Sequence, residues 1–148
     1  RITAIIASHS WVIPFQNGYK LTKAATDRLI MEGLPAKIEI DPEEIDCNIG
    51  NAGAFMNVMT RSAFEAVCGF DERFIGWGGE DDALVMSLDT MCGPHFRMDE
   101  DIYHLWHEPA PVYLDYYENN LRLCQRYSAA YGNKGAMLIL IYERFLSD

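Results

Sequence analysis

Apolar residues recur at helical spacing in several stretches of the chain, and short strand-like runs lie between these stretches. Apolar side chains about three or four positions apart share one face of a helix, whereas short unbroken apolar runs favour buried strands. The pattern predicts helices at 23–32, 61–68, 80–91, 112–132 and 134–145, with the end of another at 2–6. It predicts strands at 11–15, 52–59, 95–98 and 102–107, and a loop with one short strand at 34–50.

Residues with known end preferences support several of these boundaries. Thr22 and Thr60 stand where a helix N-cap is expected, and Gly33 and Gly69 follow the last helical residues. We interpret Asn17-Gly18 as a turn, because this dipeptide is a strong turn signal. Helices therefore alternate with short strands, and the chain is predicted to be an α/β protein with a mixed sheet, flanking helices and a C-terminal helical pair.

Length and composition indicate one globular domain over residues 1–148. The chain has 148 residues, 49% of them hydrophobic, which is enough to build a core. No apolar run approaches a membrane span, and no signal peptide is visible. The cysteines are scattered without CxxC pairs, and Cys68, Cys92 and Cys124 have apolar neighbours typical of small buried hydrophobes. These features predict a reducing, cytoplasmic location.

The charge balance restricts the partners. A formal net charge of −10 argues against nucleic acid and against an anionic membrane surface, because both require clustered Lys and Arg. Carboxylate-rich sites suit metal ions and neutral polar substrates such as sugars. The composition therefore favours a small-molecule or saccharide partner.

The stretch 70–82, FDERFIGWGGEDD, combines a Trp, several glycines and three consecutive carboxylates. It predicts a glycine loop that runs into a helix beginning near Glu80, with the acids in the first turn, where the helix dipole favours negative charge. Simple N-terminal capping remains an alternative, although capping needs only one acid. Successive helical residues diverge by about 100°. Asp81 could therefore act as a general base and Glu80 could bind a polyol, while Trp77 offers a flat face for a sugar ring.

His104 and His107 form a second group that could support chemistry. Imidazoles near carboxylates are suitable ligands for a divalent cation such as Mn²⁺. Residues three apart on a regular strand point to opposite faces. Both histidines can therefore reach one ion only if the strand bends or ends between them. Otherwise one binds the ion and the other packs elsewhere.

Three motifs together resemble a known family. The motifs 53–56 (GAFM), 69–74 (GFDERF) and 76–82 (GWGGEDD) are similar to the C-terminal part of GT-A fold glycosyltransferases, which transfer sugars from nucleotide-diphospho-sugars. The chain is most similar to the galactosyltransferase branch and to related bacterial and phage polysaccharide transferases. The resemblance extends over about 11–109. It implies a partial GT-A-like fold and an inverting, metal-dependent transfer to a saccharide acceptor.

The resemblance also implies individual roles. Asp81 matches the catalytic base and Glu80 a sugar-binding carboxylate in the catalytic site. The segment of Trp77 matches a mobile loop that closes over the nucleotide sugar, expected to be a UDP-sugar. His107 matches the metal-binding histidine, and His104 a second ligand to Mn²⁺. The substrate-binding residues implied are Trp77, Gly78, Gly79 and Asp82.

One part of the family pattern is missing from this sequence. Such enzymes hold the diphosphate through an N-terminal half that ends in an Asp-x-Asp motif, and nothing before Trp11 supplies one. The triplet 99–101 (DED) has these letters, but it follows the catalytic loop and is interpreted as a solvated turn. The chain begins with Arg1. We therefore expect a fragment that comprises a GT-A-like half (1–111) and a helical extension (112–148). By itself, this fragment is expected to have little or no transfer activity and to bind metal weakly.

The missing half should leave a sheet edge or an apolar face uncovered. We therefore expect this surface to be covered by a second copy in a homodimer or by a missing N-terminal domain. Two other functions are open at this point. One is a non-catalytic carbohydrate- or protein-binding remnant of the same fold. The other is a metal hydrolase built on His104, His107 and a carboxylate.

Overall fold

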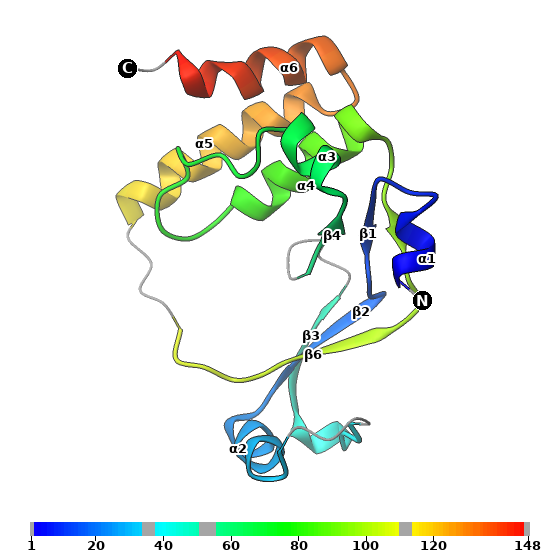
Figure 1. Cartoon of the computed structure of the whole chain (residues 1–148). Helices are drawn as coiled ribbons and strands as arrows, with labels where there is room; N and C mark the ends of the chain where they lie inside the picture. The colour runs from blue at the N-terminus through cyan, green and yellow to red at the C-terminus, as the bar shows by residue number, and fades with distance from the viewer. Residues whose placement is uncertain (1, 34–37, 51–55, 110–113, 147–148) are drawn as a thin grey trace. The chain divides into compact units, whose positions relative to one another are not determined.

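The computed structural model describes residues 2–33, 38–50, 56–109 and 114–146 (Figure 1). The chain forms two compact units. Unit 1 comprises 1–14, 53–97 and 110–148, and unit 2 comprises 15–52 and 98–109. Each unit contains a three-stranded sheet with one parallel and one antiparallel strand pair. Two mixed sheets with flanking helices confirm the predicted α/β class and are compatible with a partial GT-A-like fold.

The sheet of unit 1 is built around β1 (Trp11–Ile13). This strand pairs antiparallel with β4 (Val58–Met59) and parallel with β5 (Phe96–Arg97). Every residue of β1 is fully buried, as its unbroken apolar run predicts. The indole Nε1 of Trp11 donates a hydrogen bond to the carbonyl oxygen of Gly93 at 3.0 Å, so this buried aromatic has a polar partner. The short helix α1 (Ile2–Ile6) precedes β1.

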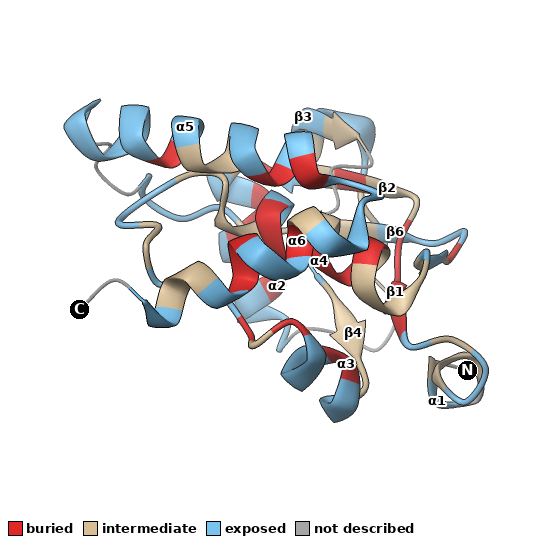
Figure 2. Cartoon of the chain, turned by 90° about the horizontal axis from the view of Figure 1, so that it is seen from above, coloured by how far each residue is buried: buried red, intermediate tan, exposed pale blue. Residues whose placement is uncertain are grey.

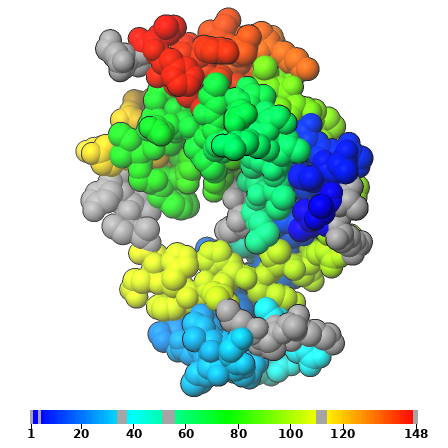
Figure 3. Space-filling model, in the orientation of Figure 1, coloured from blue at the N-terminus to red at the C-terminus, as the bar shows by residue number. Residues whose placement is uncertain are grey.

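The helices of unit 1 pack around α4 (Glu80–Cys92). The helices α3 (Arg61–Ala66), α5 (Leu114–Ala130) and α6 (Lys134–Tyr142) all contact it, and the turn η2 (Glu143–Phe145) follows α6. Figure 2 shows buried positions along α4, α5 and α6 and exposed positions on their other faces. In Figure 3 the C-terminal segment, in red and orange, lies against the green segment that includes α3. The predicted C-terminal helical pair is therefore present and belongs to the compact unit that contains α4.

Unit 2 is organised around β2 (Asn17–Leu21). This strand pairs antiparallel with β3 (Ile45–Gly50) and parallel with β6 (Asp101–His104). The helix α2 (Lys23–Met31) follows β2, and the 3-10 turn η1 (Pro42–Glu44) precedes β3. The core of unit 2 is formed by Leu21, Ala25 and Leu29, with the partly buried Ile38, Ile40, Ile45, Tyr103 and Leu105 packed against them.

Several local predictions were wrong. Asn17 and Gly18 are not a turn but the start of β2. They pair with Asp101 and Ile102 of β6, and the Asn17 side chain donates to Asp101 Oδ1 at 2.9 Å, so pairing with a distant strand overrides the local turn preference. The apolar positions Ala25, Leu29 and Ile30 follow helical spacing in the sequence, but only Ala25 and Leu29 are buried, and Ile30 is 57% exposed.

The strands predicted at 95–98 and 102–107 are shorter than expected, and they lie in different sheets. The first pairs with β1 and the second with β2. Of the strand predicted at 52–59, β4 provides only Val58–Met59, and residues 52–55 lie outside the described part of the chain. Cys68, Cys92 and Cys124 are only partly buried. Across the described residues, no helix combines the length and apolar character needed to cross a bilayer.

Candidate functional site

The acidic residues of the 70–82 segment lie in the first turn of α4, as predicted from the sequence. Gly79 is the N-cap, with a φ of 93°, and its carbonyl oxygen accepts the amide hydrogen of Ala83 at 2.9 Å. A side chain would be strained at this φ. The free N–H groups and the helix dipole favour the negative charges that follow Gly79.

Asp81 has the electrostatic properties expected of a general base. Its side chain is partly buried, and burial, followed by the nearby charges of Glu80 and Asp82, raises its pKa from 3.8 to about 6. All three causes act in the same direction, because low dielectric and like charges both disfavour the carboxylate. Asp82 is exposed. A carboxyl group with a pKa near the working pH can both accept and release a proton readily.

Glu80 is held by the loop that precedes it. Its Oε2 accepts a hydrogen bond from the amide of Gly78 at 3.0 Å. This contact connects the loop backbone to the first residue of α4. Glu80 and Asp81 therefore have different surroundings although they are adjacent, as their divergence on a helix predicts.

Trp77 is 57% exposed, and its ring stacks on Tyr117 of α5 with centroids 5.8 Å apart and an interplanar angle of 18°. The glycines after Trp77 pack closely against the same helix. A Cβ on Gly78 would lie 3.3 Å from the Tyr117 ring, and one on Gly79 would lie 3.1 Å from Cys124 Cβ. These glycines are therefore required for close approach as well as for their backbone conformation.

Sequence reasoning missed Asn120, a residue of α5 that contacts the loop directly. Its side chain is buried and hydrogen-bonded to the backbone of Ile75 and Trp77. One signal was available in the sequence. Asn120 is three positions after Tyr117 and four before Cys124, so on the helix predicted at 112–132 this amide shares a face with an aromatic residue and a cysteine.

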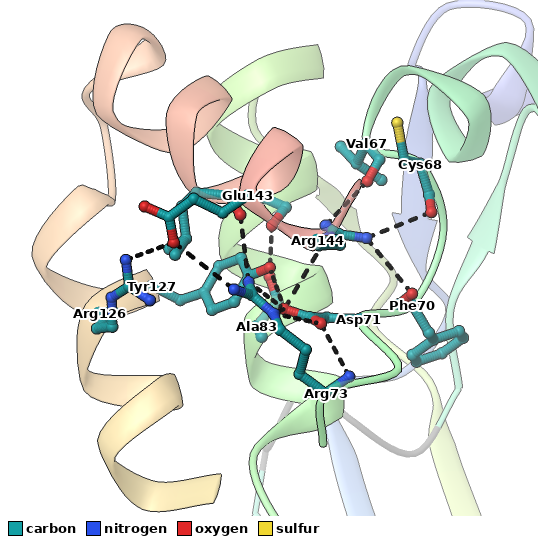
Figure 4. Close-up of polar contacts among 12 residues, drawn as sticks. Val67, Cys68, Phe70, Asp71, Arg73, Ala83, Arg126, Tyr127, Glu143 and Arg144 are labelled. Atoms are coloured by element: carbon teal, nitrogen blue, oxygen red, sulfur yellow. Dashed lines mark hydrogen bonds and ion pairs between the residues drawn. The ribbon is translucent and has the colours of Figure 1, made fainter. Parts of the chain in front are cut away.

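A buried ionic network holds the beginning of the loop (Figure 4). The Asp71 carboxylate accepts hydrogen bonds from Nε and Nη2 of Arg73, the latter at 2.8 Å, and from the Tyr127 hydroxyl at 2.8 Å. Burial acts to raise the pKa of Asp71. The hydrogen bonds from the Arg73 side chain, Tyr127 and the Arg73 amide outweigh burial, so the pKa lies below its ordinary value. Asp71 therefore keeps its charge to lower pH than an ordinary aspartate and anchors the beginning of the loop.

Arg144 extends this network to the end of α3 (Figure 4). Its guanidinium donates to the carbonyl oxygens of Val67 at 3.1 Å and Cys68 at 3.3 Å, and also to those of the next two residues. Its Nε lies 3.8 Å from Asp71 Oδ2. The last carbonyls of a helix have no partner within the helix, and a cation there also suits the dipole. A residue of η2 thus stabilises the point where the 70–82 loop begins.

The histidine pair lies in unit 2. β6 ends at His104, so the strand does end between His104 and His107, which is the condition that a shared ion requires. The two ring centroids are 5.1 Å apart. His107 Nδ1 lies 2.9 Å from the carbonyl oxygen of Glu108, and a hydrogen bond there would leave Nε2 as the acceptor nitrogen.

No group of three or more His, Cys, Asp or Glu side chains suited to a metal ion occurs among the described residues. The hydrolase hypothesis, which needs a third protein ligand beside the histidines, therefore gains no support from them. Of the triplet 99–101, Asp101 belongs to β6 and accepts a hydrogen bond from Asn17. Asp99 and Glu100 are exposed, as a solvated turn predicts.

Comparison with known families adds to this geometry. Residues 44–108 match the family model described as the N-terminal domain of galactosyltransferase. This segment is galactosyltransferase-like. The match includes the whole 70–82 segment and both histidines, and it confirms the family resemblance found in the sequence. Searches of curated proteins and of solved structures found no match.

Proposed function

We propose that the protein is an inverting glycosyltransferase that uses a nucleotide sugar. One observation carries this proposal. A partly buried carboxyl, Asp81, has a pKa raised to about 6 and lies in the first turn of α4, four positions after the exposed Trp77, within the galactosyltransferase-like segment. Capping alone gives no reason to place a destabilised carboxylate there.

In the proposed reaction, a hydroxyl of a saccharide acceptor attacks the anomeric carbon of the donor sugar. Its proton passes to the Asp81 carboxylate as the new glycosidic bond forms. The bond from the anomeric carbon to the diphosphate oxygen breaks, and the nucleoside diphosphate leaves with the electron pair. Attack opposite the leaving group inverts the configuration. Above about pH 6 Asp81 is mainly in its basic form.

The surroundings of Asp81 suit a sugar. The exposed face of Trp77 can stack on the apolar face of a pyranose ring. The carboxylates of Glu80 and Asp82 can accept hydrogen bonds from sugar hydroxyls. A UDP-sugar is the donor that the family resemblance implies.

We expect Asp81→Asn to reduce kcat by at least about 100-fold, because the amide cannot accept the acceptor's proton. The measurement is transfer from a panel of UDP-sugars to saccharide acceptors with Mn²⁺ present. Glu72→Gln is the matched control, since Glu72 is an exposed carboxylate of the same loop, and it should leave kcat unchanged. Normal transfer by Asp81→Asn would refute the base assignment. Saccharide binding without transfer by the unaltered chain would favour the non-catalytic alternative.

We further propose that His104 and His107 hold a divalent cation such as Mn²⁺. Two imidazoles 5.1 Å apart, one with its Nδ1 close to a carbonyl oxygen, have the donor chemistry for such an ion. When bound, the cation would supply positive charge for the diphosphate of the donor. Two protein ligands are few, so we expect weak binding in which diphosphate oxygens complete the coordination.

Calorimetric titration of Mn²⁺ with UDP tests this site without any transfer assay. His107→Ala should weaken Mn²⁺–UDP binding by about tenfold or more, because it removes one of two imidazole ligands. His9→Ala is the matched control, because His9 belongs to unit 1 and contacts Phe96 there. Equal affinities for His107→Ala and the unaltered chain would exclude His107 as a ligand.

A further inference from the structure

Both polar atoms of the Asn120 side chain are hydrogen-bonded to the loop that carries Trp77. Its Nδ2 donates to the carbonyl oxygens of Ile75 at 3.0 Å and Trp77 at 3.1 Å. Its Oδ1 accepts the amide hydrogen of Ile75 at 3.2 Å. The side chain is 2% exposed, so these backbone groups replace the water that the amide would otherwise bind.

A buried Asn in the interior of a helix is energetically unfavourable, so its presence at position 120 indicates a specific structural role. Asn is a poor residue for the interior of a helix, and a buried amide is unfavourable unless all its polar atoms are paired. The segment it contacts has no helix or strand of its own and contains Gly76, Gly78 and Gly79, all with positive φ. Such a backbone has high conformational entropy and needs an external constraint to hold one conformation.

Two neighbours of Asn120 on α5 support the same loop. Tyr117, about one turn earlier, stacks on the ring of Trp77. Cys124, about one turn later, lies beneath Gly79. One face of α5 therefore fixes the loop at its backbone, at its exposed aromatic ring and at the start of α4.

We propose that Asn120 is a positioning residue, which holds Trp77 where the sugar binds. This inference rests on the proposed glycosyltransferase function. Asp81 is carried by α4, whose buried residues Leu84 and Leu88 anchor it separately. Loss of Asn120 should therefore affect substrate binding by the loop more than the chemical step at Asp81.

The first experiment measures the loop without any substrate. Amide hydrogen exchange followed by mass spectrometry should show faster exchange in the peptide that covers residues 74–79 in Asn120→Ala. The peptide that covers 84–92 of α4 should be unchanged. Asn119→Ala is the matched control, since Asn119 is the exposed neighbouring residue on the same helix. Unchanged exchange at 74–79 in a folded Asn120→Ala protein would overturn the proposal.

The second experiment separates binding from chemistry. Asn120→Ala should raise KM by about tenfold while kcat changes by less than about threefold, the opposite of the split expected for Asp81→Asn. Tyr117→Ala should shift KM in the same direction. Its side chain is at the surface, so this variant still provides a test if Asn120→Ala does not fold. Loss of kcat with unchanged KM in these variants would contradict a positioning role.

Asn120→Asp tests the hydrogen bonds rather than the side-chain volume. It keeps an acceptor for the Ile75 amide but places an oxygen against two carbonyl oxygens, so it should loosen the loop as alanine does. Wild-type exchange in Asn120→Asp would overturn the proposal. If the unaltered chain transfers no sugar from any donor, the proposed function fails, whereas the exchange experiment still decides whether Asn120 constrains the loop.

Discussion

At the scale of single residues, the 70–82 segment contains two aspartates whose environments act in opposite ways. Asp71 is more deeply buried than Asp81, yet its pKa is lowered, because Arg73 and Tyr127 donate hydrogen bonds to it. The pKa of Asp81 is raised, because burial acts first and the charges of Glu80 and Asp82 add to it, with no cation to offset them among the causes of its shift. Shifts in opposite directions suit a structural role for Asp71 and the proposed role of Asp81 as a base.

The raised pKa of Asp81 predicts a dependence of stability on pH. The folded-state pKa of about 6 exceeds the unfolded value of 3.8, so the folded chain binds this proton more tightly. Its contribution is favourable at low pH and is lost as the pH rises from about 4 to about 6. Asp81→Asn should therefore be more stable than the unaltered chain at pH 7.5, by about 1 kcal/mol, since solvent screens part of the effect.

Urea unfolding at about pH 7.5 and about pH 4.5 measures this difference. The advantage of Asp81→Asn should shrink at the lower pH, where the carboxyl becomes protonated in the folded chain. Glu72→Gln, which removes an exposed carboxylate, should show no such change between the two pH values. A variant Asp81→Asn that is less stable than the unaltered chain at pH 7.5 would show that Asp81 stabilises the fold.

At the scale of elements, the sequence predicted best where the deciding interaction is local. The Thr22 and Thr60 hydroxyls accept hydrogen bonds from Ala25 and Ala63, as N-caps should, at 3.2 Å and 3.1 Å. The start of α4 at Glu80 was also predicted. Each of these signals acts between residues a few positions apart.

Strands were predicted less well, because their partners are distant in the sequence. β4 and β5 have two residues each, and what makes them strands is pairing with β1. A run of two residues has no periodicity to detect. The turn predicted at Asn17-Gly18 failed for the same reason, since β3 and β6 decide the conformation of β2.

The sequence also predicts core packing for an aromatic stripe on α5, formed by Tyr113, Tyr116, Tyr117, Leu121 and Cys124. Tyr113 lies outside the described residues, and Tyr116 and Leu121 are 45% and 48% exposed, so this prediction is wrong for these two. The part of α5 near Tyr117 supports the Trp77 loop instead. Periodicity identified this face of the helix, but it could not show that a loop some 40 residues away covers it.

At the scale of the whole molecule, the 70–82 segment and its supporting helices belong to one compact unit, and the histidine pair belongs to the other. The family match spans parts of both. The sequence motifs identified residues in each unit, whereas the supporting contacts of Asn120 and Arg144 join positions 43 to 77 residues apart. No short motif encodes such contacts, so the structure was needed to find them.

The division into a GT-A-like half (1–111) and a helical extension (112–148) stays a prediction, and truncation tests it. A chain that ends at residue 111 loses the six buried residues of α5 and α6, four of which have large apolar or aromatic side chains: Tyr127, Met137, Leu140 and Ile141. Their burial contributes at least about 6 kcal/mol together, which is comparable with the total stability of a domain, about 5–15 kcal/mol. We therefore expect the truncated chain to lose cooperative unfolding of unit 1.

The readout is urea unfolding followed by near-ultraviolet circular dichroism, which reports the fixed packing of aromatic residues. A chain that ends at residue 132 is the graded comparison. It retains Asn120 and Tyr127 but lacks α6 and Arg144, so it should still unfold cooperatively, at a lower midpoint than the full chain. If the chain ending at residue 111 keeps the unfolding midpoint of the full chain, α5 and α6 are an appended extension. If that midpoint is lost, these helices are part of the scaffold that holds the candidate catalytic loop.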